Sequence, residues 1–387
     1  MRRVYFGADN IITSLGFTTG ENAGQVREGR SGIVKMSDDR LYPGPMTLSG
    51  INDDRLDEKV REFIGDSNFA DSFTRLEKIF ILSILNVLIG NSIDPGDPRT
   101  IFIFSTTKGN IDLLESTRRL LFEPGRVHLW RMAEVITQFF GSPNKPVIIS
   151  NACISGSSAI MAASRLIASG RYDHAVVSGG DIISGFVISG FQSFQALSPE
   201  ACRPFDIRRN GLSLGEGCGT VILTADENNA DHQQTVEYLG GAATNDANHI
   251  SGPSPDGEGL YLAIAAAMKE AGVSPADIDF ISAHGTATLY NDEMESLALH
   301  RAGLSHVPVN SFKGCIGHTL GASGVIETIL SVFSMRNNIL FKSTGYTENG
   351  LSRPLNVITR NMNQPVRRIL KTASGFGGCN AAIVIGY

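Results

Sequence analysis

Short apolar runs alternate along this chain with longer segments in which small and apolar residues recur at helical spacing. The short runs predict strands at 4–7, 101–104, 147–149, 175–178, 220–224, 235–239, 280–283, 307–310 and 382–385. The longer segments predict helices at 20–29, 72–89, 154–169, 259–271, 291–301 and 324–336. Because strands that alternate with helices are typical of parallel sheets covered on both faces, we expect an α/β fold.

The two halves of this pattern resemble each other. In each half, a short strand meets a turn that contains cysteine or glycine, and a helix of small residues follows, at 154–169 and at 321–336. We therefore expect two similar α/β lobes related by a pseudo-dyad, the first at 1–230 and the second at 231–387.

Composition excludes several classes of protein. The chain has 387 residues, of which 42% are hydrophobic and 19% charged, and its formal net charge of −6 argues against general nucleic-acid binding. The most apolar run, 79–89, is too short to span a bilayer, so we expect no membrane insertion. Five widely spaced cysteines without a Cys-x-x-Cys pair argue against a disulfide framework or a zinc site, and favour a reducing, cytoplasmic location.

Cys153 is the strongest candidate for chemistry. It stands between the apolar strand 147–149 and the small-residue helix 154–169, so it is expected at a helix N-terminus. Free backbone N–H groups and the helix dipole favour a thiolate there, and a thiolate is a good nucleophile for an acyl thioester. An inert buried cysteine is the alternative interpretation.

Two histidines strengthen the catalytic interpretation. His284 follows the predicted strand 280–283, and His318 lies in the glycine-rich segment 313–324. Carbon–carbon bond formation from a malonyl thioester needs an acyl acceptor and hydrogen-bond donors for an enolate. A cysteine with two neutral imidazoles meets both needs.

These motifs together resemble those of β-ketoacyl-acyl-carrier-protein synthases, the condensing enzymes of fatty-acid and polyketide assembly. The resemblance runs from 16–33 to 375–380, and the Cys-His-His set is similar to the elongating branch of the family. It implies a thiolase-like fold with five α-β-α-β-α layers. It also implies a homodimer, acyl carrier protein as partner, substrates carried on phosphopantetheine, and no metal or other cofactor.

The resemblance assigns roles to the reactive residues. Cys153 corresponds to the acylated nucleophile, and His284 and His318 to the pair that binds the malonyl thioester and assists loss of CO2. Lys313 corresponds to a lysine that tunes the site electrostatically. Glu327 matches the glutamate that pairs with this lysine, and its apolar neighbours favour a buried, partnered side chain.

Further residues are assigned in the same way. Thr286 and Thr288 correspond to hydroxyls that hold phosphopantetheine. Phe376 corresponds to a gate between acyl pocket and entrance, and its N–H, with that of Cys153, to an oxyanion hole. Asp292 matches an acidic residue of the Lys313 network, although capping of the helix 291–301 explains it nearly as well.

Basic residues are expected at the substrate and the carrier protein. Lys108 lies where relatives carry glycines and a small apolar residue, which suggests an unusual acyl group. Arg208 and Arg209 are candidates for a basic entrance, with Arg75 and Lys78 as weaker ones. For each of these four, a solvated surface charge is about as good an explanation.

The predicted reaction is decarboxylative condensation of a Cys153-bound acyl group with malonyl carrier protein to give 3-oxoacyl carrier protein. Alternatives are a partner or specialised ketosynthase subunit of a secondary-metabolite pathway, and a thiolase-type acyltransferase that uses coenzyme A. The strand before Cys153, the loop after Phe104 and the apolar stretch 182–194 are expected at the homodimer interface. The competing interpretation buries 182–194 within its own subunit.

Overall fold

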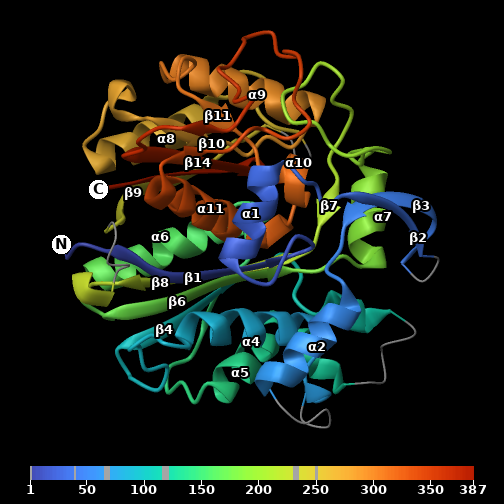
Figure 1. The fold of residues 1–387 in the computed structure, drawn as a ribbon, viewed down its shortest axis with the longest axis vertical. Coiled ribbons are helices and arrows are strands. Elements are labelled where there is room, and N and C mark those ends of the chain that lie inside the picture. The colour runs from blue at the N-terminus through green and yellow to red at the C-terminus, as the bar shows by residue number, and fades with distance from the viewer. Residues whose placement is uncertain (1, 39–40, 65–69, 116–121, 230–234, 249–251) are drawn as a thin grey trace.

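The computed structural model describes residues 2–38, 41–64, 70–115, 122–229, 235–248 and 252–387. Ten of its strands form one sheet in the order β11-β10-β14-β15-β9-β1-β8-β6-β4-β5. Figure 1 shows that the two halves of this sheet lie as two layers, with helices between them and on their outer faces. Strands of the first half are β1 (Tyr5–Thr13), β4 (Thr100–Ser105), β5 (Val147–Ile149), β6 (His174–Asp181) and β8 (Gly217–Thr224). Strands of the second half are β9 (Glu237–Asn245), β10 (Phe280–Ser282), β11 (Val309–Asn310), β14 (Arg368–Gly375) and β15 (Cys379–Gly386).

Both halves have the same topology. Counted within its own half, each sheet places its third strand at the edge, followed by the second, fourth, fifth and first. The second strand of each half pairs in parallel with the third and fourth, whereas the fifth pairs antiparallel with the fourth and first. The halves join where Tyr5 of β1 pairs with Glu237 of β9. The expectation of parallel sheets was therefore wrong for the inner strands, and the sheet is mixed.

Helices complete five layers. Between the two halves of the sheet lie α6 (Ser155–Ala168) and α11 (Ser323–Asn337), which contact each other and strands of both halves (Figure 1). The outer face of the first half carries α4 (Arg75–Leu88), α2 (Asp53–Ile64) and α5 (Leu129–Phe139); that of the second half carries α8 (Glu258–Ala271) and α9 (Leu289–Arg301). This arrangement matches the expected thiolase-like α-β-α-β-α architecture.

The central helices can touch because glycines face each other. A Cβ added to Gly156 would lie 2.7 Å from the backbone N of Val325, and one added to Gly324 only 2.2 Å from the backbone N of Ser157. Apolar side chains from both halves, Ile160 and Ile326 among them, extend this contact into one buried core. The core fixes the N-terminal ends of α6 and α11 side by side.

Smaller elements lie around this body. They are α1 (Thr19–Glu28), β2 (Val34–Asp38), β3 (Tyr42–Ser49), α7 (Gly185–Ser193), β7 (Leu214–Gly215), α10 (Lys313–Ile316), β12 (Ile339–Leu340) and β13 (Met362–Asn363). The sequence pattern did not predict α2, α5 or the β2–β3 hairpin. Among the residues described, no helix is long and apolar enough to cross a membrane.

The apolar stretch that was predicted at an interface is only partly buried. The apolar stretch 182–194 contains α7, where Val187, Ile188 and Phe191 are buried within the subunit, while Phe186 and Phe194 are exposed. The buried residues fit the interpretation that this stretch packs within its own subunit, and the two exposed phenylalanines fit the interpretation that it belongs to an interface. The predicted lobe boundary at 230 and 231 falls outside the described residues and stays a prediction.

Candidate active site

Cys153 lies at the turn between β5 and α6. The turn is tight, because Ala152 has a φ of 44°, a left-handed conformation that is unfavourable for a residue with a side chain. Ser155 fixes the turn: its Oγ accepts from the backbone N of Asn151 at 2.8 Å and donates to the carbonyl O of Ala152 at 2.6 Å. Strain held in this way is common where a fold presents a reactive side chain.

Burial controls the resting protonation of Cys153. Because the side chain is enclosed, burial raises the pKa of its thiol to about 12, although Lys313 and Lys108 act in the opposite direction. A helix dipole contributes up to about 2 kcal/mol in a favourable, partly buried geometry, and one pKa unit corresponds to about 1.36 kcal/mol, so the dipole offsets only part of this effect. The buried position therefore favours a neutral thiol at rest rather than the thiolate that the sequence pattern favours, and a neutral thiol must give up its proton when its sulfur attacks.

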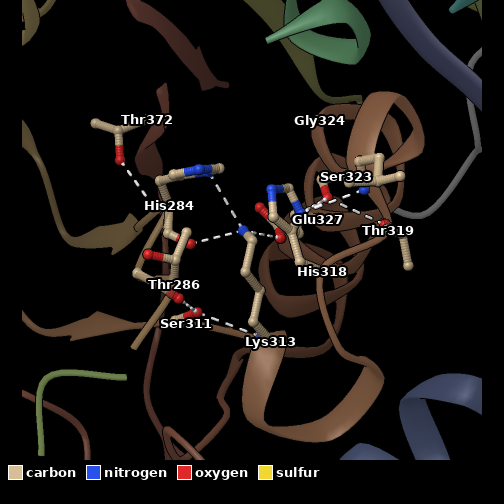
Figure 2. A network of polar contacts seen from close by, with 12 residues as sticks. His284, Thr286, Ser311, Lys313, His318, Thr319, Ser323, Gly324, Glu327 and Thr372 are labelled. Carbon is tan, nitrogen blue, oxygen red and sulfur yellow. Dashed lines mark hydrogen bonds and ion pairs between the residues drawn. The ribbon is translucent and has the colours of Figure 1, made fainter. Parts of the chain in front are cut away.

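His284 follows β10 and is held from two sides. Glu295, on α9, accepts from the backbone N of His284 at 2.8 Å and from that of Gly285 at 2.7 Å. On the other side, the Nζ of Lys313 lies 2.6 Å from the carbonyl O of His284, 3.3 Å from its Nδ1 and 2.6 Å from Glu327 Oε1 (Figure 2). An ammonium only donates, so Nδ1 accepts and the ring proton resides on Nε2.

His318 reaches the same tautomer by a different route. Its Nδ1 accepts from the backbone N–H of Leu320 at 3.2 Å and lies 3.0 Å from the Oγ of Ser323. A backbone N–H cannot accept, so this nitrogen carries no proton and Nε2 is the donor. Burial first, and the charge of Lys313 second, lower the pKa of both histidines well below its ordinary value. The two rings are neutral N–H donors, with centroids 5.2 Å apart.

The predicted pairing of Glu327 with Lys313 is present in the structure. Glu327 lies on α11 and is fully buried with its partner. A second lysine, which the sequence pattern did not predict, lies here as well: Lys371 of β14 is 2.7 Å from the other carboxylate oxygen of Glu327 and is also fully buried. A lysine inside the apolar strand 368–375 is the signal that could have revealed it, because a buried charge requires a partner.

One cavity joins the predicted residues. It has a volume of about 370 Å³, and its walls include Cys153, His284, His318 and Phe376. Thr286 and Thr288 also line it, with their hydroxyls 2.9 Å apart, and their contact with phosphopantetheine stays a prediction. The exposed residues Leu289 and Tyr290 also line this cavity.

Cys153, His284 and His318 also form a potential metal-ligand set, since one ligand atom from each lies within 4.8 Å of the others. However, the Nδ1 atoms of both rings already face hydrogen-bond donors, which leaves Nε2 protonated. A metal ligand needs a free lone pair on the nitrogen that faces the metal. The hydrogen-bond pattern therefore fits a pair of donors better than a metal centre.

Phe376 stands at the end of the β14–β15 hairpin, beside Cys153. Its ring packs against Phe191 and Phe194, with centroids 5.5 Å and 4.9 Å away. The backbone before it approaches the nucleophile closely, since a Cβ on Gly375 would lie 2.9 Å from the backbone N of Cys153. Gly377 has a φ of 88°, a conformation that glycine adopts without strain. A partly exposed ring on such a loop can change position.

Asp292 does not cap α9, contrary to one interpretation. The helix begins at Leu289, two residues earlier than expected, with Thr288 as N-cap. The buried carboxylate of Asp292 instead accepts from the backbone N–H groups of Thr286 and Phe205, and burial raises its pKa to about 6. It holds the loop that carries the two threonines rather than contacting Lys313.

Asp181 is a further residue that the sequence analysis missed. It ends β6, and its buried carboxylate accepts from the hydroxyl of Thr106 at 2.8 Å and from the backbone N of Gly321 at 2.7 Å. It therefore ties the loop after β4 to the segment that follows His318. Burial raises the pKa of this carboxyl.

The predicted basic residues separate into different environments. Lys108 is half-buried, donates to the hydroxyl of Thr107 at 3.1 Å, and is not among the residues that line the cavity. Arg208 is exposed, whereas Arg209 is buried and donates to the carbonyl O of Gly350 at 2.6 Å. The interpretation of Arg209 as part of a basic entrance was wrong, because its guanidinium serves the protein's own backbone.

The two weaker basic candidates are paired as well. Arg75 lies 2.8 Å from Glu216 and 2.8 Å from Asp53, and Lys78 lies 3.4 Å from Asp71. Both side chains are less than one-fifth exposed. Arg208 also lies 3.3 Å from Asp206, but its side chain is 57% exposed, so its exposure makes it the best placed of the proposed entrance residues.

Comparison with known proteins agrees with this geometry. Residues 106–229 match the N-terminal domain of beta-ketoacyl synthases, and residues 236–347 match the C-terminal domain. A 3-oxoacyl-[acyl-carrier-protein] synthase 2 of Rhizobium meliloti is 36% identical over 279 residues, which are 68% of this chain and 66% of that protein. The chain thus spans about two thirds of the length of this relative.

Solved structures extend the likeness to the whole chain. A structure of a ketosynthase in complex with its chain length factor, from Xenorhabdus doucetiae, matches with a TM-score of 0.86 at 26% identity and covers 100% of this chain and 98% of the other. The ishigamide ketosynthase/chain length factor matches with a TM-score of 0.87 at 25% identity, covering 100% and 99%. On this evidence, the chain belongs to the β-ketoacyl synthase family.

Proposed function

We propose that the chain condenses an acyl group with a malonyl group, both delivered on acyl carrier protein, and releases CO2. The observation that carries this proposal is the placement of the Cys153 thiol beside two neutral N–H donors in one cavity. The names of the related proteins, 3-oxoacyl-[acyl-carrier-protein] synthase and ketosynthase, support the same reaction.

In the first half-reaction, the sulfur of Cys153 attacks the acyl thioester. The acyl carbon–sulfur bond to the carrier breaks, the proton of the Cys153 thiol passes to the departing sulfur, the carrier leaves as a thiol, and the acyl group is held on Cys153. The backbone N–H groups of Cys153 and Phe376 are the proposed donors to the oxyanion. Such donors matter because negative charge develops on the carbonyl oxygen as the bond forms.

In the second half-reaction, the malonyl thioester carbonyl accepts from the Nε2–H groups of His284 and His318. Loss of CO2 leaves an enolate whose charge the two donors stabilise. The enolate carbon attacks the acyl carbon, the bond from that carbon to the sulfur of Cys153 breaks, and 3-oxoacyl carrier protein results. The departing thiolate takes up a proton from water, which restores the thiol. Because the pKa of both histidines is lowered, the rings are neutral and each keeps one N–H. Such a group suits this task, since it donates a hydrogen bond without giving up its proton.

The cavity provides room for the carrier's arm. Thr286 and Thr288 are the proposed contacts of phosphopantetheine, Phe376 is the proposed gate, and exposed Arg208 is the proposed contact of an acidic carrier protein. No metal or other cofactor is needed for these steps. Lys108 stays a proposed determinant of the acyl group, acting from the neighbouring turn rather than from the cavity wall.

We also propose that the chain works as a homodimer. β5 is an edge strand of the sheet with partly exposed side chains, and the adjacent α5 exposes Trp130. A chain length factor is the alternative partner, since two matched structures contain one. The five free cysteines, all buried, are consistent with the proposal of a cytoplasmic location.

Release of CO2 from malonyl carrier protein, with and without an acyl donor, tests the reaction. A condensing enzyme releases CO2 faster when an acyl donor is present, and forms 3-oxoacyl carrier protein in equal amount. A thiolase-type acyltransferase transfers the acyl group to coenzyme A without releasing CO2. A non-catalytic partner subunit releases no CO2 and forms no acyl-enzyme.

A further inference from the structure

A single buried carboxylate, that of Glu327, holds two lysines. Its Oε1 lies 2.6 Å from the Nζ of Lys313 and its Oε2 lies 2.7 Å from the Nζ of Lys371. All three side chains are inaccessible to water, and Lys371 also donates to the carbonyl O of Thr372. The three residues come from α10, α11 and β14, so the cluster joins three elements, and its Lys313 contacts His284.

The two lysines outnumber the carboxylate that lies between them. Burial lowers the pKa of Lys371, while the charges of Glu327 and of the buried Glu295 act in the opposite direction, so the second lysine carries its charge at a cost in solvation. A single lysine would have neutralised Glu327. Neutralising Glu327 therefore does not explain why a second lysine, Lys371, is buried beside it.

The excess positive charge lies next to the donor histidines. The groups that face His284 are Lys313 on α10, Glu295 on α9, Lys371 on β14, His318 in the following loop, Glu327 on α11 and Cys153 before α6. The carboxylate of Glu295 accepts hydrogen bonds from the backbone N–H groups of His284 and Gly285 and from the hydroxyl of Thr372. Lys313 and Lys371 both act against protonation of His284 and of His318.

We propose that Lys371 is a positioning residue of decarboxylation, acting through Glu327 and Lys313 to keep His284 in its neutral, Nε2-protonated form. This inference rests on the proposed function. By sharing the charge of Glu327, Lys371 leaves the ammonium of Lys313 incompletely neutralised, and that ammonium donates to Nδ1 of His284. Without Lys371, Lys313 and Glu327 form a neutral pair and His284 gains a proton more readily.

A pH profile separates this role from simple packing. In Lys371→Met, removal of a positive charge raises the pKa of His284, so the acid limb of CO2 release should move to higher pH by at least about half a unit. Lys371→Gln, which keeps a polar side chain but no charge, is measured in parallel in case the Met variant does not fold. Lys371→Arg keeps the charge and should leave the limb unmoved.

Two controls complete the design. Lys269→Met removes an exposed lysine of α8 and should leave the profile of the wild type unchanged. Acylation of Cys153 should persist in the charge-removal variants and is measured from the intact mass of the protein. Persistence would show that the fold and the nucleophile are intact. If these variants lose activity equally at all pH values, or keep the wild-type limb, the inference is wrong. If the wild type itself releases no CO2, the proposed function fails instead.

Discussion

The Nζ of Lys313 lies 2.6 Å from the carbonyl O of His284 and 3.3 Å from the Nδ1 of the same residue. This double contact fixes both the position of the ring and its tautomer. Since the neighbouring His318 is fixed in the same tautomer by the backbone of Leu320, two N–H groups from different loops act as donors in one cavity. The donors exist before any substrate binds, which is the condition for efficient stabilisation of an enolate.

The two histidines should matter more in one half-reaction than in the other. His284→Ala and His318→Ala should each slow release of CO2 from malonyl carrier protein by about 10²–10³-fold, since each removes one enolate donor. Acylation of Cys153 should fall much less. His306→Ala, which changes an exposed histidine, is the matched control. An equal loss in both half-reactions would contradict this division of roles.

The resting thiol of Cys153 should show a high pKa. With that pKa near 12, alkylation of Cys153 by iodoacetamide should accelerate by about tenfold per pH unit from pH 7 to 9, because only the thiolate reacts. The rate is followed by mass spectrometry of the peptide that contains Cys153. A plateau below pH 8 would show that the helix N-terminus stabilises the thiolate after all.

The contact between α6 and α11 should tolerate no added methyl group. Gly324→Ala places a Cβ about 2.2 Å from the backbone N of Ser157, so we expect a loss of at least about 1–3 kcal/mol in the free energy of unfolding. Gly24→Ala, at an exposed helical position with open space, should instead stabilise by about 0.5–1 kcal/mol. Urea denaturation of both variants measures the contrast, and equal stabilities would contradict close packing of the central helices.

The gate proposal concerns Phe376. Phe376→Ala removes the ring that packs on Phe191 and Phe194, so malonyl carrier protein should bind before the acyl donor more often, and uncoupled CO2 release should rise. Ile89→Ala, which changes an exposed apolar residue at the end of α4, is the control. Initial-rate kinetics with both carrier substrates give the order of addition. Unchanged order and coupling would make Phe376 a packing residue only.

The sequence predicted those features that local patterns encode. The strand–turn–helix around Cys153 is visible because three apolar residues precede it and small residues follow. The helices 259–271 and 324–336 were found within a residue or two of their observed ends, where glycine or asparagine in the left-handed conformation closes them. The doubled α/β pattern likewise indicated two similar halves.

Features that depend on contacts distant in sequence were not predicted. β8 pairs antiparallel with β6 and β1, and β15 with β14 and β9. Neither orientation has a signature within the strand itself, because it depends on which neighbours the strand meets. Lys371 was overlooked because its partner, Glu327, is 44 positions away and only the fold brings them to 2.7 Å. Arg209 was misjudged for a related reason, since sequence pattern does not distinguish an arginine bound to backbone carbonyls from an exposed one.

The most direct test of the central claim is formation of 3-oxoacyl carrier protein by the wild type and by Cys153→Ala. Both proteins are incubated with acyl and malonyl carrier proteins, and the carrier-bound product is weighed by mass spectrometry alongside measurement of CO2. We predict that the wild type forms the condensed product with one CO2 for each molecule, and that the alanine variant, though folded, forms none. Condensation by Cys153→Ala at the rate of the wild type would contradict the account.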